Sequence, residues 1–80
     1  MIVVTSSSNL IDGATHDTKK GYRHEVITGG AEITISAIAR DGAVGEIAVI
    51  PVNSTRSYDF VCDTILIGGT GGQITSVRAD

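Results

Sequence analysis

The aliphatic side chains of this sequence are almost all β-branched. Eleven Ile and eight Val stand against two Leu, and nine Thr add to the branched total. Branched side chains are restricted at χ1 and pack well on a pleated surface, whereas helices favour Leu, Met, Gln and Glu. Ten Gly supply turns between short strands. The chain is therefore predicted to be all-β.

Alternation with a period of two divides the chain into short strands separated by turn signals. The clearest strand is residues 31–39, where Ile33 and Ile35 alternate with polar residues. Gly29-Gly30 precedes it and is a hairpin signal. The other predicted strands are residues 2–5, 22–28, 46–52, 58–67 and 73–78. We expect a small antiparallel sandwich or barrel of about five to seven short strands.

Three segments carry more specific expectations. Residues 46–52 have apolar residues on both faces, which predicts burial on both sides, and Pro51 places the end of this run at an edge, a bulge or a terminus. Residues 58–67 change apolar phase near Asp63, which predicts a β-bulge. The polar stretch from Asp12 to Gly21 is predicted to be the longest loop.

The length of the chain limits how it can be stabilised. Eighty residues are expected to form a single domain, residues 1–80, which buries only about 60 to 65% of its unfolded surface. Cys62 is the only cysteine, so no internal disulfide can form, and His16 and His24 lack the short spacing of a metal pair. Association is the remaining source of stability, so we expect a homo-oligomer or a subunit of a larger assembly.

Charge and hydropathy exclude several partners. A net charge of −3 and a pI near 5.1 disfavour nucleic acid and anionic lipid, so neither nucleic acid nor membrane is expected as a partner. The apolar run near the start, residues 2–4, is too short for a signal peptide, and no segment is long enough to span a membrane. We expect a soluble protein made in the cytosol.

No cluster of residues predicts catalysis. The glycine cluster at residues 68–72 lacks the Gly-Lys-Ser/Thr ending of a phosphate loop, so it is interpreted as a turn or a close backbone contact. Asp12, His16 and Asp17 could ligate a metal or form an acid/base pair, but a solvated turn is favoured. Cys62, within an apolar run, is interpreted as a buried unreactive thiol. We therefore predict no catalytic, cofactor-binding or metal site, no cofactor and no enzymatic activity.

The best electrostatic feature is a basic cluster that could meet an acidic partner surface. It consists of Lys19, Lys20, Arg23 and His24, with Tyr22 among them. A solvated loop and strand edge is the alternative, because edge strands often carry Lys against wrong pairing. The candidate partner contacts are Lys19, Lys20, Tyr22, Arg23 and Tyr58.

The C-terminal half resembles the small all-β accessory proteins of tailed bacteriophage virions, namely capsid decoration (cement) and spike or fibre-base proteins. The residues that carry this resemblance are 56–61, 64–67, 68–72 and 74–78. It implies a non-enzymatic virion component, made in the host cytoplasm, that forms a trimer or another cyclic assembly and docks on a capsid shell or a tail. The alternatives are a tail spike or carbohydrate-binding module that contacts a host receptor and, ranked last, a small enzyme.

Overall fold

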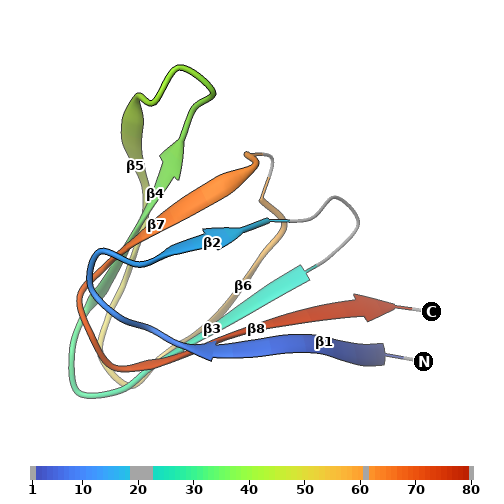
Figure 1. The fold of residues 1–80 in the computed structure, drawn as a ribbon. Helices are drawn as coiled ribbons and strands as arrows, with labels where there is room; N and C mark the ends of the chain where they lie inside the picture. Colours follow the sequence, from blue (N-terminus) through green and yellow to red (C-terminus); the bar gives the residue numbers. More distant parts are fainter. Residues whose placement is uncertain (1, 19–22, 61, 80) are drawn as a thin grey trace.

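The computed structural model describes residues 2–18, 23–60 and 62–79, and it is all-β (Figure 1). Eight strands form two antiparallel sheets of four strands each, arranged like a sandwich, which confirms the predicted fold class with a higher strand count. The strands are β1 (Ile2–Asn9), β2 (Thr15–Asp17), β3 (Arg23–Thr28), β4 (Ile33–Ile38), β5 (Val44–Ile50), β6 (Thr55–Tyr58), β7 (Thr64–Gly68) and β8 (Gly72–Ala79).

The two sheets lie like the arms of a wedge (Figure 1). One sheet has the order β1-β8-β3-β6 and the other has the order β2-β7-β4-β5. The β4–β5 hairpin joins neighbours within one sheet, whereas the other connections cross from sheet to sheet. Four crossings, from β1, β3, β5 and β7, lie together where the arms meet, which we call the closed end. The opposite end, where the sheets diverge, is the open end.

The core lies between the sheets and consists mainly of aliphatic side chains at alternate strand positions. Because the molecule measures 33 × 32 × 16 Å, few side chains have neighbours on all sides. The buried apolar residues are Leu10, Val26, Ile33, Ile35, Ile50, Ile65, Ile67 and Ile74.

Backbone hydrogen bonds and close backbone packing connect the crossing segments at the closed end. The Leu10 amide donates a hydrogen bond of 3.0 Å to the Gly72 carbonyl, and the Gly71 amide donates one of 3.0 Å to the Leu10 carbonyl. Gly72 has φ +103°, and a Cβ there would overlap the carbonyl oxygen of Ile27. The glycine cluster is therefore a turn with close backbone approach, as the sequence predicts.

Two sequence predictions about connections are wrong. Gly29-Gly30 is not a hairpin, because β3 pairs with β6 and β8 while β4 lies in the other sheet. The predicted strand 58–67 is interrupted, since β6 ends at Tyr58 and β7 begins at Thr64 in the opposite sheet. The change of apolar phase near Asp63 therefore marks a passage between sheets and not a bulge.

The predicted long loop contains a strand. β2 pairs with β7 through three residues, with His16 opposite Ile65, and this pairing raises the strand count above the predicted range. The strand is short and largely polar because it lies at the edge of its sheet, where one side needs no partner.

Candidate functional site

The clearest departure from a closed sandwich is β5, one of the two edge strands of its sheet. It pairs with β4 on one side only, so the other row of backbone N–H and C=O groups has no strand beside it. The register shifts between Ile35 and Ser36 because Ile47 is an extra residue on β5, between Glu46 and Ala48. Pro51 directly follows the strand, in agreement with its predicted place at a terminus.

The prediction that residues 46–52 are buried on both sides is wrong. Ile50 and Ala48 face the core, but the side chains of Val44, Ile47 and Val49 are exposed, and no other described strand pairs with this edge. We call these exposed residues, together with Val52, the β5 apolar surface. Its members and their exposed fractions are Val44 (56%), Ile47 (50%), Val49 (47%) and Val52 (48%).

An open apolar depression adjoins this surface at the β4–β5 hairpin. Small side chains such as Ala37, Ala39 and Ala43 leave it unfilled, and Cys62 lies at its side. Its volume is about 390 Å³, and Glu46 is the one charged residue in its lining. Aliphatic surface therefore continues from the free edge of β5 to the hairpin.

β6, one of the two edge strands of the other sheet, contrasts with β5. Thr55, Arg56 and Ser57 are exposed on β6. The Arg56 guanidinium donates a hydrogen bond of 3.0 Å to the Thr55 carbonyl. Polar and charged side chains on an edge discourage pairing with other chains. β5 carries a single charge, Glu46, and lacks this protection.

Of the five predicted partner contacts, only Arg23 and Tyr58 belong to the described residues, on the paired strands β3 and β6. Arg23 lies 3.5 Å from Asp59, and both side chains are largely exposed. Tyr58 is half-buried against the core and stacks on Phe60, with ring centroids 5.4 Å apart. Lys19, Lys20 and Tyr22 lie outside the described residues. Whether the remaining pair contacts a partner stays a prediction.

His24 does not belong to the basic cluster as a surface residue. It alternates with buried Val26 and Thr28 on the inner face of β3 and is only 2% exposed. Its Nδ1 lies 2.8 Å from the Ser76 hydroxyl, and its ring lies 5.5 Å from that of Phe60. Burial lowers the pKa of His24, nearby Asp59 raises it, and His16 lowers it further. An imidazole in this position favours the neutral form.

His16 lies on the inner face of the opposite sheet. Its register partner is Ile65, a core residue whose side chain shares that face. The Nε2 atoms of His16 and His24 are both buried, and neither has a hydrogen-bond partner. The two sheets thus bring together a pair of histidines that the sequence places eight positions apart without predicting their proximity.

The other nominated residues are dispersed. Asp12 lies at the closed end, where its carboxylate accepts a hydrogen bond of 2.8 Å from the Gly69 amide, whereas Asp17 is exposed on β2. With His16 on the inner face, these three residues form no joint site. Cys62 lies in the β6–β7 connection and not in a strand, half-buried against the core.

Within residues 2–18, 23–60 and 62–79, no group of three or more His, Cys, Asp or Glu side chains could hold a metal ion. The same residues contain no helix of the length and apolarity that a membrane span requires. Comparisons with protein-family models, curated proteins and solved structures each return no match.

Proposed function

We propose that this chain is a structural protein of a virion, a capsid decoration protein that associates with copies of itself through β5 and docks as an oligomer on the shell. The observation that carries the proposal is the β5 apolar surface, four exposed aliphatic residues on and beside an edge strand with unpaired backbone. The virion setting comes from the resemblance carried by residues 56–61 and 64–78.

A second copy of the chain is the occupant that this edge favours. An unpaired edge accepts another strand through main-chain hydrogen bonds, and an antiparallel strand pairs with its own copy about a two-fold axis. The two Glu46 carboxylates are the only β5 charges that such pairing would bring near each other, and the exposed Ile47 and Val49 would be covered. Burying aliphatic surface stabilises the assembly by about 25 cal/mol per Å².

The need for this association follows from the small core. Eight apolar residues are buried among those whose burial the structure describes, and an 80-residue chain gains little from burial in excess of the conformational entropy lost on folding. A partner that binds only the folded state shifts the folding equilibrium toward that state. Self-association and docking on a shell would both act in this way.

The test compares two matched edge substitutions. Ile47→Lys places a charge in the middle of the β5 edge, and Thr55→Lys places one on the polar β6 edge. Sedimentation over a dilution series should show an oligomer for the wild type and Thr55→Lys, and a folded monomer for Ile47→Lys. A wild type that is monomeric and well folded at every concentration would contradict the self-association.

A second arm tests the shell. Capsids stripped of accessory proteins are mixed with the wild type or with Ile47→Lys, and bound chain and thermal rupture of the shell are measured. We expect the wild type to bind in a fixed ratio and to raise the rupture temperature, with weaker binding by Ile47→Lys. Absence of wild-type binding to any such shell would refute the decoration role while leaving the oligomer result intact.

A further inference from the structure

We propose that His24, buried opposite His16 between the two sheets, is an acid-sensitive latch: the sheets stay closed at the open end while the His24 imidazole is neutral, and they separate there when it becomes protonated. This inference does not depend on the proposed function, because both residues belong to one chain. It rests on where the two strands place the side chains and on the partners that the ring atoms have or lack.

The two imidazoles come from opposite sides of the core. His16 is on β2, in register with buried Ile65, and His24 is on β3, in register with Tyr58 on one side and Ser76 on the other. β2 ends and β3 begins at the open end (Figure 1), His24 is the second residue of β3, and His16 pairs with Ile65, the second residue of β7. Closure of the sheets at this end therefore places one imidazole near the other.

The hydrogen bonds of His24 suit a neutral ring. Its Nδ1 can donate to or accept from the Ser76 hydroxyl, and in either tautomer its buried Nε2 has no partner. A protonated ring would have N–H donors at both positions, and the donor at Nε2 would be buried without an acceptor. The Nε2 atom of His16, which is also buried without a partner, offers no charge that would stabilise the His24 imidazolium, and His16 lowers the pKa of His24.

Few charged groups nearby can compensate. Asp59, the carboxylate that acts on His24, is 70% exposed and is also 3.5 Å from Arg23. Aromatic rings cover His24 from the β6 side, where Phe60 lies 5.5 Å away. The titratable or charged groups on the described elements around His24 are His16, Asp17, Arg23, Glu25, Arg56, Tyr58, Asp59, Cys62, Asp63 and Arg78.

The sign of the pH effect follows from burial. The pKa of His24 is lowered below the ordinary value of 6.5, so the unfolded chain binds a proton more readily than the folded chain. The corresponding stability is complete above pH 6.5 and is lost as the pH falls through the lower, folded-state value. Acid should therefore loosen the fold at pH values above those at which most carboxylates titrate.

The test measures urea unfolding between pH 7.5 and pH 5 for the wild type, His24→Gln and His16→Gln. We expect the wild-type unfolding constant to rise by a factor that approaches ten per pH unit below pH 6.5, which is the limit for one lowered group. Both variants should show a smaller rise over the same interval. Equal acid sensitivity of the wild type and His24→Gln would overturn the latch.

Side-chain NMR titration of the wild type decides the question if His24→Gln does not fold. The pKa of His24 should lie below 6.5, and His16→Gln should raise it. A His24 pKa at or above 6.5, or no response to His16→Gln, would overturn the proposal. Repeating the urea series in Ile47→Lys should give the same pH dependence, which separates the latch from self-association.

Discussion

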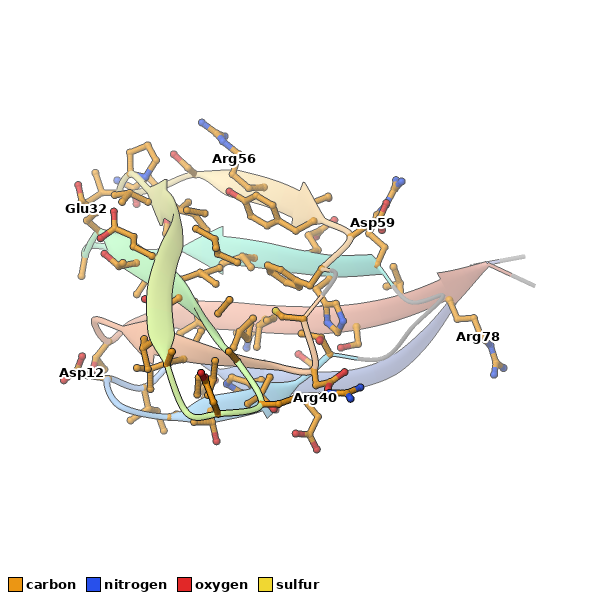
Figure 2. The ribbon with its side chains drawn as sticks, turned by 90° about the horizontal axis from the view of Figure 1, so that it is seen from above. Asp12, Glu32, Arg40, Arg56, Asp59 and Arg78 are labelled. Atoms are coloured by element: carbon orange, nitrogen blue, oxygen red, sulfur yellow. The ribbon has the colours of Figure 1, made fainter. Side chains whose placement is uncertain are left out.

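The two ends of the wedge are held by different kinds of contact. At the closed end, backbone amides and carbonyls of crossing segments bond directly, as Leu10 does with Gly71 and Gly72 at 3.0 Å. At the open end, the two sheets face each other through side chains: His24 on β3, which bonds to Ser76 of the neighbouring strand β8, lies opposite His16 on β2. The Arg23–Asp59 ion pair at this end is exposed and lies within one sheet. Figure 2 shows Asp59 and Arg40 on the side of the molecule away from Asp12 and Glu32.

Because of this difference, the two ends should respond to different perturbations. Backbone hydrogen bonds between buried segments do not titrate, and they depend on glycine at positions where a Cβ has no room. Side-chain contacts that involve imidazoles and carboxylates change with pH and salt. The closed end should therefore be destabilised by amino-acid substitutions, and the open end by changes in the pH and salt concentration of the solution.

The largest effect is expected from Gly72→Ala at the closed end. The added Cβ would overlap the Ile27 carbonyl oxygen, and the backbone has φ +103°. We expect a loss of about 3 to 5 kcal/mol in the free energy of unfolding, from backbone strain and overpacking together. Urea denaturation measures this loss.

Gly30→Ala is the control, because a Cβ there meets open space and should change stability by no more than about 1 kcal/mol. Equal stability of the two variants would contradict a tightly packed closed end.

Thr28→Val should have the next largest effect. The buried Thr28 hydroxyl donates to the Pro51 carbonyl at 2.6 Å and accepts from the Ser54 amide at 2.8 Å. Valine keeps the shape but leaves both backbone groups without this partner, so we expect a loss of about 1 to 3 kcal/mol. Thermal unfolding should show almost no change for Thr55→Val, an exposed position one strand away. A neutral Thr28→Val would mean that water replaces the hydroxyl.

The sequence predicts the parts of this fold that depend on neighbours along the chain. Period-two alternation locates the core positions Ile33 and Ile35, and Arg40-Asp41-Gly42 predicts the β4–β5 turn, where Gly42 has φ +90° and the Asp41 carboxylate accepts from Ala43. The burial of His24 follows the same rule, since positions 24, 26 and 28 share one face. The alternation therefore indicates that His24 is buried, whereas the adjacent basic residues favour interpreting it as a surface residue.

Features that depend on strand order could not be predicted from the sequence. A Gly-Gly pair fits a hairpin or a crossing, and the choice at Gly29-Gly30 depends on the pairing of β3 with β8, nearly fifty residues later in the chain. Likewise, an Ile- and Val-rich run fits a central strand or an exposed edge, and β5 is exposed only because no strand follows it in the sheet. The β5 apolar surface and the histidine pair both result from this long-range arrangement.

Acidification should distinguish the two ends within one protein. Lowering the pH from 7.5 to 5.5 should speed amide exchange in β2 and near His24 before it speeds exchange at Leu10 and Gly71, because protonation opposes closure only at the open end. The limiting change is about 1.4 kcal/mol per pH unit for each lowered group. Hydrogen exchange followed by NMR, corrected for the intrinsic pH dependence, measures the difference. A uniform acceleration over both ends would indicate global unfolding and not local opening.

Asp59→Asn at the open end should have the smallest effect on stability, but it should change the pKa of His24. Its ion pair with Arg23 is largely exposed, so its loss should cost no more than about 0.5 kcal/mol at neutral pH. Because Asp59 raises the pKa of His24, its neutralisation should lower that pKa further and extend the acid-sensitive interval to lower pH. Asp63→Asn is the matched control, since Asp63 pairs with Arg40 at 3.6 Å and is also exposed, but is not among the groups that shift His24. An NMR titration in which Asp59→Asn raises the His24 pKa, or in which both variants shift it equally, would show that specific charges near the ring do not control the open end.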